Sequence, residues 1–139
     1  QAIVWCRFRR DVENVLARLR KIKKTAVRYD GTVGDVDRVA ACRAFQDGSA
    51  QFFVATAASA GEGLDLWAAQ TVVYYSNSFK LSERLQSEDR AHRIGQKHPV
   101  HYVDLVAEDT VDAHLLRTLR KKDEIARIVT GDAIREWLN

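Results

Sequence analysis

Several residue types are scarce in this chain of 139 residues, and each scarcity excludes a class of structure. Its two cysteines, Cys6 and Cys42, both lie in apolar patterns, which favours reduced core residues over a disulfide scaffold or a zinc site. No apolar run approaches the roughly 18 residues that a membrane-spanning helix needs. The opening run QAIVWCRF has neither a basic leader nor a cleavage site, which excludes a signal peptide. Because no initiating methionine is present, we expect a piece of a longer protein.

The residues that are present indicate one globular domain. Hydrophobic residues make up 46% of the chain and charged residues 29%, as in soluble globular proteins. A chain of this length can bury a core without disulfides or metals. We expect a single domain over residues 1–139, in which 110–139 form a C-terminal helical extension. The formal charge of +3 is compatible with a polyanionic partner without requiring one.

Apolar runs alternate with amphipathic segments along the chain. Five short runs rich in β-forming residues predict strands, at 2–8, 25–30, 51–57, 71–77 and 100–106. Helical spacing predicts two helices with buried stripes, Val12, Val15, Leu16, Leu19 and Ile22 in the first and Val36, Val39, Ala40 and Phe45 in the second. Strands separated by helical crossovers predict an α/β fold, an open parallel sheet covered by helices on both faces.

The last long helix has signals at both ends. Thr110 is a good N-cap for a helix over residues 110–129, and Asp112 is favourably placed in its first turn. Gly131 is expected to end this helix, and a short helix is expected over residues 132–139.

Polar residues follow the ends of the predicted strands. The segments concerned are 30–32, 59–65 and 76–78, and the helix that carries residues 86–96 comes next. Ligands of open α/β sheets bind beyond the carboxyl ends of the strands. We therefore expect one rim of the sheet to hold nearly all the unusual chemistry.

The loop at residues 60–65, AGEGLD, carries two glycines around one residue. Such a loop lets the backbone approach a ligand and point its N–H groups at an anion. It lacks the third glycine of the dinucleotide fingerprint, and no stretch matches the G-x-x-x-x-G-K-[ST] phosphate loop. A tight connection that needs positive φ explains the glycines equally well.

The segment QSEDRAHRIGQ, residues 86–96, places Gln86, Arg90 and Arg93 on one helix face. Arginine has a planar charged fork suited to phosphate oxygens, and a fixed arginine can stabilise charge on a γ-phosphate during hydrolysis. The alternative is a solvated helix face with ordinary four-apart ion pairs. Spacing alone leaves both interpretations open.

Residues 86–96 resemble motif VI of the superfamily-2 helicases, in the form used by SWI/SNF-type DNA-translocating ATPases. Residues 60–66 resemble motif V, and residues 29–32 resemble the "DGS/T" segment, followed as in the family by Arg38 and Phe45. Residues 2–15 resemble motif IV, and residues 110–132 resemble the helix that follows the second lobe. The resemblance runs in order from residue 2 to about residue 133, and it implies the second RecA-like lobe of such an enzyme.

The resemblance implies an ATP-dependent mechanism shared between two lobes. ATP with Mg²⁺ would lie between them, held mainly by an N-terminal RecA-like lobe of the same parent chain, so this chain alone would be inactive. Arg93 would be the primary arginine finger, Arg90 a second one, and Gln86 would orient them. Further contacts would come from two sets of residues: Gly61, Gly63 and Asp65 toward the nucleotide, and Thr32, Thr56 and Ser59 toward nucleic acid. The implied partner is double-stranded DNA, with no membrane and no metal bound by this lobe itself.

The chain also departs from the remodelling enzymes. Residues 57–59, AAS, stand where many of them have an arginine, Asp65 replaces the more usual asparagine, and the lobe has no room for large insertions. These departures favour a prokaryotic or phage-type member that is cytoplasmic and nucleoid-associated, with the nucleus expected if the protein is eukaryotic. The alternatives are a non-catalytic nucleic-acid-binding module, a DEAD-box-like RNA helicase lobe and a doubly wound dehydrogenase.

Overall fold

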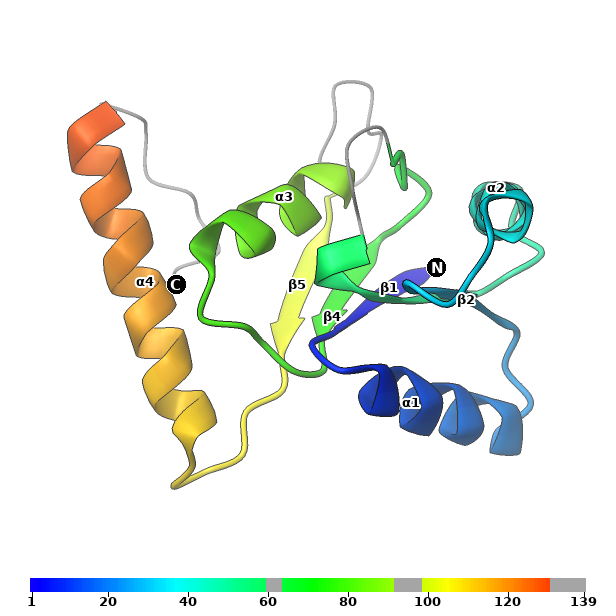
Figure 1. Cartoon of the computed structure of the whole chain (residues 1–139), viewed down its shortest axis with the longest axis horizontal. Helices are drawn as coiled ribbons and strands as arrows, with labels where there is room; N and C mark the ends of the chain where they lie inside the picture. The colour runs from blue at the N-terminus through cyan, green and yellow to red at the C-terminus, as the bar shows by residue number, and fades with distance from the viewer. Residues whose placement is uncertain (60–63, 92–98, 131–139) are drawn as a thin grey trace.

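A parallel sheet of five strands forms the centre of the molecule in a computed structural model, which describes residues 1–59, 64–91 and 99–130 (Figure 1). The strand order is β2-β3-β1-β4-β5, and all four pairings are parallel. The strands are β1 (Ala2–Cys6), β2 (Ala26–Tyr29), β3 (Phe52–Thr56), β4 (Thr71–Tyr74) and β5 (His101–Asp104). The predicted fold class, an open parallel α/β sheet, is confirmed.

Helices cover both faces of this sheet. They are α1 (Arg9–Lys21), α2 (Asp35–Gln46), α3 (Leu81–Ala91) and α4 (Val111–Thr130), with a short 3-10 helix, η1, at Ala57–Ser59. Alternate residues of a strand point to opposite faces. In β1, Ile3 and Trp5 therefore join the core under α2 and α3, whereas Val4 and Cys6 join the core under α1. Figure 1 accordingly shows α1 on one side of the sheet and α2 and α3 on the other.

The first helix follows its predicted stripe except at the end. Val12 and Leu19 are buried against Val4 and Val54 of the sheet. Ile22 was predicted to be buried, but it caps the helix after Lys21 and is 49% exposed. The chain turns at Lys23, whose φ of 57° directs it into β2, so the helix ends before Ile22 can continue the buried stripe.

The predicted stripe of the second helix is wrong at three of its four positions. Phe45 is fully buried, but Val36 and Val39 are 83% and 60% exposed and Ala40 is exposed as well. The buried ring of Phe45 packs edge-on against Phe53, 5.5 Å away between ring centroids. That contact turns the helix so that Ala41, one turn earlier, faces the sheet.

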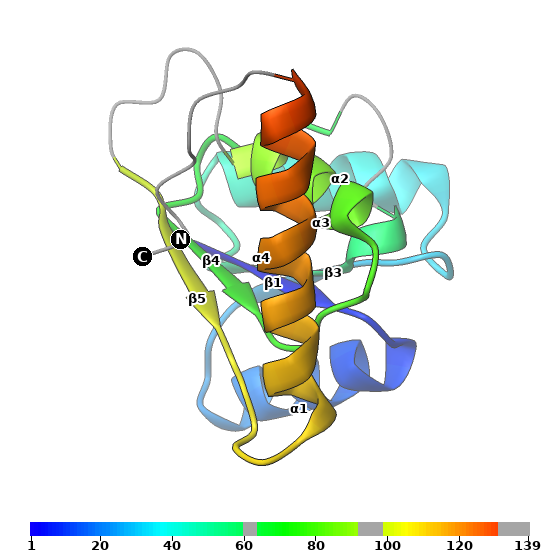
Figure 2. The same cartoon turned by 90° about the vertical axis from the view of Figure 1, so that its left-hand side faces the viewer.

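The last described helix, α4, packs beside α3 rather than on the sheet (Figures 1 and 2). Thr110 caps it as predicted, because its Oγ1 accepts a hydrogen bond from the N–H of Asp112 at 3.2 Å. Leu115, Leu116 and Leu119 form its buried stripe against Leu81. The predicted stop at Gly131 and the short helix over residues 132–139 lie outside the described residues. Within the described part of the chain, no helix is both long and apolar enough to cross a membrane.

Candidate functional site

Polar side chains gather where β2, β3 and β4 end, as the sequence predicts. Thr56 ends β3, and its hydroxyl donates to Ser59 Oγ at 2.8 Å. Ser59 Oγ in turn lies 3.0 Å from the carbonyl oxygen of Tyr29 at the end of β2, which can accept its proton. Thr56 and Ser59 are thus brought together and join the ends of two neighbouring strands. Both hydroxyls have protein partners, and a contact with nucleic acid stays a prediction.

Thr32 belongs to a tight turn after β2. Its backbone N–H donates to Asp30 Oδ1 at 2.8 Å and its hydroxyl donates to the same oxygen, while Arg28 Nε donates to Asp30 Oδ2 at 2.7 Å. Burial alone raises the pKa of the fully buried Asp30, but the hydrogen bonds from Thr32 and Arg28 outweigh it and hold the pKa below its usual range. Thr32 is therefore a turn-forming residue, and its proposed role toward nucleic acid is untested.

A shallow pocket lies beyond the ends of β1, β3 and β4. Its floor includes Cys6, whose pKa is raised to about 12 by burial and by the nearby carboxylate of Asp11, so its thiol stays protonated and is no nucleophile. Ser76 Oγ accepts from the N–H of Arg7 at 2.8 Å and donates to Asp11 at 2.6 Å. The lining residues are Cys6, Arg7, Ala57, Ala58, Tyr74, Ser76, Asn77, Ser78, Glu83, Arg84 and Ser87.

One side of this pocket is a buried ion-pair network that sequence reasoning missed. Arg84 on α3 is 3% exposed, and its Nε donates to Glu88 Oε1 at 2.6 Å. The same guanidinium donates to both carboxylate oxygens of Asp104 on β5, at 2.6 and 3.1 Å, and lies 3.4 Å from the ring centroid of Tyr74 on β4. One side chain thus fixes α3 to two strands. The four-residue spacing of Arg84 and Glu88 was a visible signal, but nothing in the sequence pointed to Asp104.

The Arg84 guanidinium keeps its charge although the side chain is buried. Burial alone lowers the pKa of Arg84, but Tyr74 and the carboxylates of Asp104 and Glu88 raise it above its ordinary value. Burial also raises the pKa of Tyr74, whose neutral hydroxyl lies 2.7 Å from Ser87 Oγ. Arg84 therefore remains a cation at all physiological pH values.

The C-terminal end of α3 carries the described part of the arginine motif. Gln86 is exposed and Arg90 is half-buried, and the Arg90 carbonyl accepts a hydrogen bond from the N–H of Leu66 at 3.1 Å. Arg90 Nε is buried and has no hydrogen-bond partner among the described residues. Arg93 lies outside the described residues, as do Gly61 and Gly63.

The backbone of Arg90 is an exception to the expectation that one strand-end rim holds nearly all the unusual chemistry. As a crossover between parallel strands, α3 begins after β4 and runs back along the sheet (Figure 1). Its last turn therefore lies beside Leu66, in the segment that leads into the start of β4. Thr56, Ser59 and Ser76 are on the rim, and Arg90 is at the far end of the helix that starts there.

The segment at residues 64–69 bridges α2 and α3. Gln46 at the end of α2 donates to the carbonyl of Asp65 at 2.7 Å and accepts from the N–H of Ala68 at 3.1 Å. Leu64, Leu66 and Ala69 are buried in the core under the two helices. Asp65, predicted to help bind the nucleotide, has an exposed side chain next to this anchored backbone.

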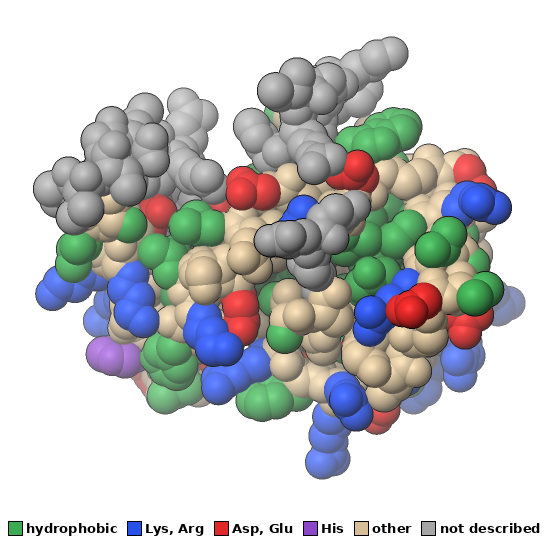
Figure 3. Space-filling view, turned by 45° about the horizontal axis from the view of Figure 1, so that its top comes forward, with side chains coloured by type: hydrophobic (Ala, Val, Ile, Leu, Met, Phe, Trp, Pro, Cys, Tyr) green, Lys and Arg blue, Asp and Glu red, His purple; other side chains and the backbone are tan. Residues whose placement is uncertain are grey.

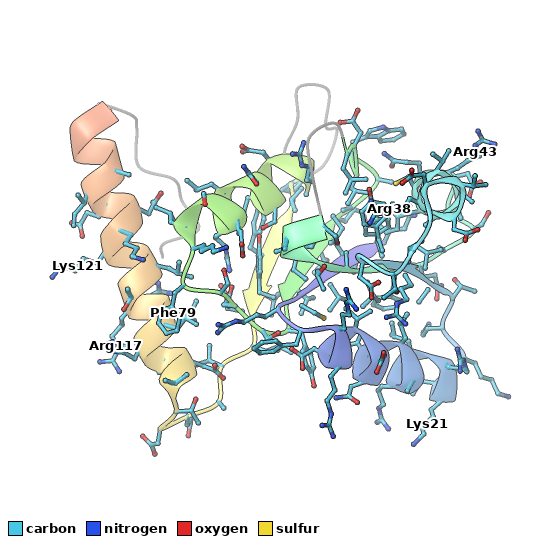
Figure 4. The ribbon with its side chains drawn as sticks, in the orientation of Figure 1. Lys21, Arg38, Arg43, Phe79, Arg117 and Lys121 are labelled. Atoms are coloured by element: carbon cyan, nitrogen blue, oxygen red, sulfur yellow. The ribbon has the colours of Figure 1, made fainter. Side chains whose placement is uncertain are left out.

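A second arginine lies on the same side of the sheet (Figure 4). Arg38 on α2 stacks over the Tyr29 ring at 5.3 Å and donates to the carbonyl of Asp30 at 3.2 Å. Its Nε is also buried without a partner in the described part of the chain. Burial raises the pKa of Tyr29, and the charges of Arg38 and Arg90 both oppose that rise, so both act on the same hydroxyl. Two guanidinium groups with an open donor fit an anionic ligand such as a nucleotide phosphate.

No metal-binding cluster is found in the described part of the chain. Among the described residues, no group of three or more His, Cys, Asp and Glu side chains could hold an ion.

Comparison with known proteins gives a family match over most of the chain. The model of the helicase conserved C-terminal domain matches residues 1–95. Helicase SWR1 of Cryptococcus neoformans is 36% identical over 114 residues, which is 80% of this chain and 9% of that protein. The chromatin-remodeling ATPase INO80 of Candida albicans is 33% identical over 107 residues, 76% of this chain and 8% of that protein. The ATP-dependent helicase fft3 of Schizosaccharomyces pombe is 28% identical over 134 residues, 96% of this chain and 14% of that protein.

A solved structure shares the fold. The crystal structure of the C-terminal part of the Fun30 ATPase domain superposes with a TM-score of 0.79 at 23% identity, and the match covers 86% of this chain and 39% of that one. The chain spans between 4% and 14% of the length of the curated relatives it matches. The relatives named here are eukaryotic SWI/SNF-type helicases, so the expectation of a prokaryotic or phage-type, cytoplasmic protein is not supported.

Proposed function

The chain belongs to the helicase conserved C-terminal domain family, and from that membership we propose that it is the second lobe of an ATP-dependent DNA translocase of the SWI/SNF type. In this proposal ATP with Mg²⁺ binds between this lobe and an N-terminal RecA-like lobe of the same parent chain. Family membership also removes the reason for considering a dehydrogenase. Because relatives include a chromatin-remodeling ATPase, we place the parent protein in the nucleus.

The observation that carries the proposal is the open donor of Arg90 at the end of α3. Its Nε is buried without a partner among the described residues, and its backbone is held by Leu66. A buried guanidinium donor without an acceptor is costly unless a ligand supplies one. A nucleotide phosphate is such a ligand, and its hydrolysis would supply the free energy for movement along DNA. Arg93, three residues further on, would serve as the primary finger, and Gln86 would orient the pair.

The contacts with DNA are proposed at the strand-end rim. Thr56 ends β3 and its hydroxyl donates to Ser59 Oγ, which contacts the Tyr29 carbonyl at the end of β2, and Thr32 lies three residues beyond Tyr29 in the turn that Asp30 holds. Such groups would bind phosphate oxygens and carry no base information, which suits an enzyme that steps along any duplex. Gly61, Gly63 and Asp65 lie in the sequence between Ser59 of this rim and Leu66, which donates to the Arg90 carbonyl, and they would couple the two sites.

The test is DNA-stimulated ATP hydrolysis by the full-length protein. We expect Arg93→Ala to lower kcat by about 10³-fold or more, as for other arginine fingers, while nucleotide affinity changes little. Arg90→Ala should lower kcat in the same way. Arg117→Ala, which removes an exposed arginine from α4, is the matched control and should leave kcat unchanged. Normal hydrolysis by the Arg93→Ala and Arg90→Ala enzymes would refute the proposed roles.

A further inference from the structure

The positive charge of this chain is concentrated in one short segment. Residues 7–24 contain eight basic and two acidic side chains, a formal charge of +6, whereas the whole chain carries +3. The rest of the molecule is therefore at −3, with 14 basic and 17 acidic residues. The eight basic residues, which we call the α1 basic surface, are Arg7, Arg9, Arg10, Arg18, Arg20, Lys21, Lys23 and Lys24.

All eight of these side chains are exposed, and none forms an ion pair with another described residue. The two acids of the segment do not neutralise them. Glu13 pairs with Arg28 of β2 at 3.6 Å, and Asp11 accepts a hydrogen bond from Ser76. The charge of the surface is thus uncompensated by the fold.

The α1 basic surface lies away from the proposed nucleotide end of the lobe. Val12 and Leu19 direct the apolar stripe of α1 into the sheet, so Arg10 and Lys21, on the opposite side of the helix, point outward. Figure 4 shows Lys21 projecting away from the sheet. The helix covers the face opposite α2 and α3 (Figure 1). Figure 3 shows the molecule from the side of α2 and α3, where acidic and basic side chains are interspersed.

We propose that the α1 basic surface is a further binding surface for the phosphate backbone of double-stranded nucleic acid, which begins at the strand-end rim with Arg7 and Arg9 and extends along α1 to Lys24. A helix of 13 residues is about 20 Å long. A duplex carries one phosphate charge per roughly 1.7 Å of its axis, so a segment of that length offers more anions than the surface has cations. Flexible lysines and arginines on an exposed helix can reach such a backbone without any preformed pocket.

Two other polyanions fit the surface less well. A membrane-bound amphipathic helix inserts its apolar face into the lipid, but the apolar residues of α1, Val12 and Leu19, are buried against the sheet. An acidic protein would need an apolar interface core between the charges. The outward ridge of α1 has none, because it consists of Arg10, Asn14, Ala17 and Lys21.

The choice of nucleic acid as the polyanion rests on the proposed function, whereas the existence of the charged surface does not. A translocase with this surface would hold a duplex on the outer side of its second lobe as well as at the rim. That arrangement would increase the time the enzyme stays on DNA without changing the chemistry at Arg90.

The test compares two triple variants with the same change in net charge. Arg10→Gln, Arg18→Gln and Lys21→Gln together neutralise the centre of the α1 basic surface. Arg117→Gln, Arg120→Gln and Lys121→Gln neutralise three exposed cations on α4 and form the control (Figure 4). Affinity for a short fluorescent duplex is measured by anisotropy with this chain between about 50 and 200 mM KCl, and equal melting curves establish that both variants are folded.

We expect the α1 variant to bind the duplex at least about tenfold more weakly at low salt and to reduce the slope of log K against log[KCl] by about 2 to 3. The α4 control should retain most of the wild-type slope. Equal losses in both variants would indicate a general charge effect and overturn the proposal, as would an unchanged α1 variant. Equal affinity for vesicles rich in phosphatidylserine or for polyglutamate would overturn the assignment to nucleic acid. None of these outcomes depends on ATP hydrolysis, so they are separable from the Arg93→Ala result.

Discussion

Arg84 has the most constrained environment of the described charged side chains. Its guanidinium binds Glu88 and both oxygens of Asp104 and stacks on Tyr74; Arg84, Glu88 and Tyr74 are buried, and the Asp104 side chain is 20% exposed. Water cannot replace these partners, so removal of the cation leaves two carboxylates close together in a buried site. The fork of arginine also matches the two oxygens of Asp104, which the single ammonium of lysine cannot do.

We therefore expect Arg84→Met to lower the free energy of unfolding by about 3–5 kcal/mol, because breaking a buried pair leaves uncompensated charge. Arg84→Lys should recover only part of the loss. Urea denaturation of this chain measures the free energy of unfolding of both variants. Arg120→Met on the exposed face of α4 is the control and should change stability by no more than about 0.5 kcal/mol. A loss at Arg84 as small as that of the control would mean that the network does not fix α3.

At the residue scale, the sequence predicted the family from one long motif, but it could not predict contacts between residues that are distant in the chain. The segment 86–96 predicted the family correctly because nine specified positions within eleven consecutive residues agree with its motif. Asp104 could not be matched to Arg84, because twenty residues and a β-pairing separate them. Val36 and Val39 were assigned to the core by their hydrophobicity, but the packing of Phe45 on Phe53 decides which face of α2 is buried.

At the scale of elements, α4 is the part least integrated with the sheet. Its buried residues, Leu115, Leu116 and Leu119, form their own cluster with Leu81 of α3, separate from the two cores that contact the strands. Lys122 Nζ on α4 donates to the carbonyl of Phe79 in the loop before α3, at 2.9 Å. Regions with few buried contacts open at lower free energy than the whole molecule.

We expect amide hydrogens of α4 to exchange faster than those of β1. Leu119→Ala should lower the opening free energy of α4 further, by about 2–5 kcal/mol, and so accelerate its exchange. Exchange in β1 should be nearly unaffected at the same time. Arg120→Ala, the exposed neighbour, serves as control. Hydrogen exchange followed by mass spectrometry resolves the two elements, and a uniform acceleration of the whole chain would show instead that α4 is part of the main cooperative unit.

The order of elements was predictable because each strand here is a short apolar run and the first two crossovers, α1 and α2, were recognised by helical spacing. Predicted strands were longer than the observed ones by two or three residues, since polar residues such as Arg7 and Ser76 continue the chain after pairing stops. The direction of α3 follows from the parallel sheet, but sequence reasoning did not use this direction to place Arg90. A helix that starts at one rim delivers its last turn to the other end of the sheet, which is where Arg90 lies.

At the scale of the whole molecule, two groups of basic side chains lie on opposite faces of the sheet. Open arginine donors lie with α2 and α3, and the α1 basic surface lies on the opposite face. No stretch of the sequence has the phosphate-loop pattern, and the described residues offer no metal cluster. In the proposed account the lobe contributes arginines to a nucleotide that another lobe holds, and hydrolysis belongs to the pair.

The most direct test of that account is the steady-state rate of ATP hydrolysis by this chain alone, measured beside the full-length protein. Saturating ATP, Mg²⁺ and duplex DNA are present in both assays, and a cooperative melting curve establishes that the isolated chain is folded. We predict DNA-stimulated hydrolysis by the full-length protein and no hydrolysis above buffer by the isolated chain. Sustained, DNA-stimulated turnover by the isolated chain would contradict the assignment of a half-site, because it would require this lobe to hold and hydrolyse ATP by itself.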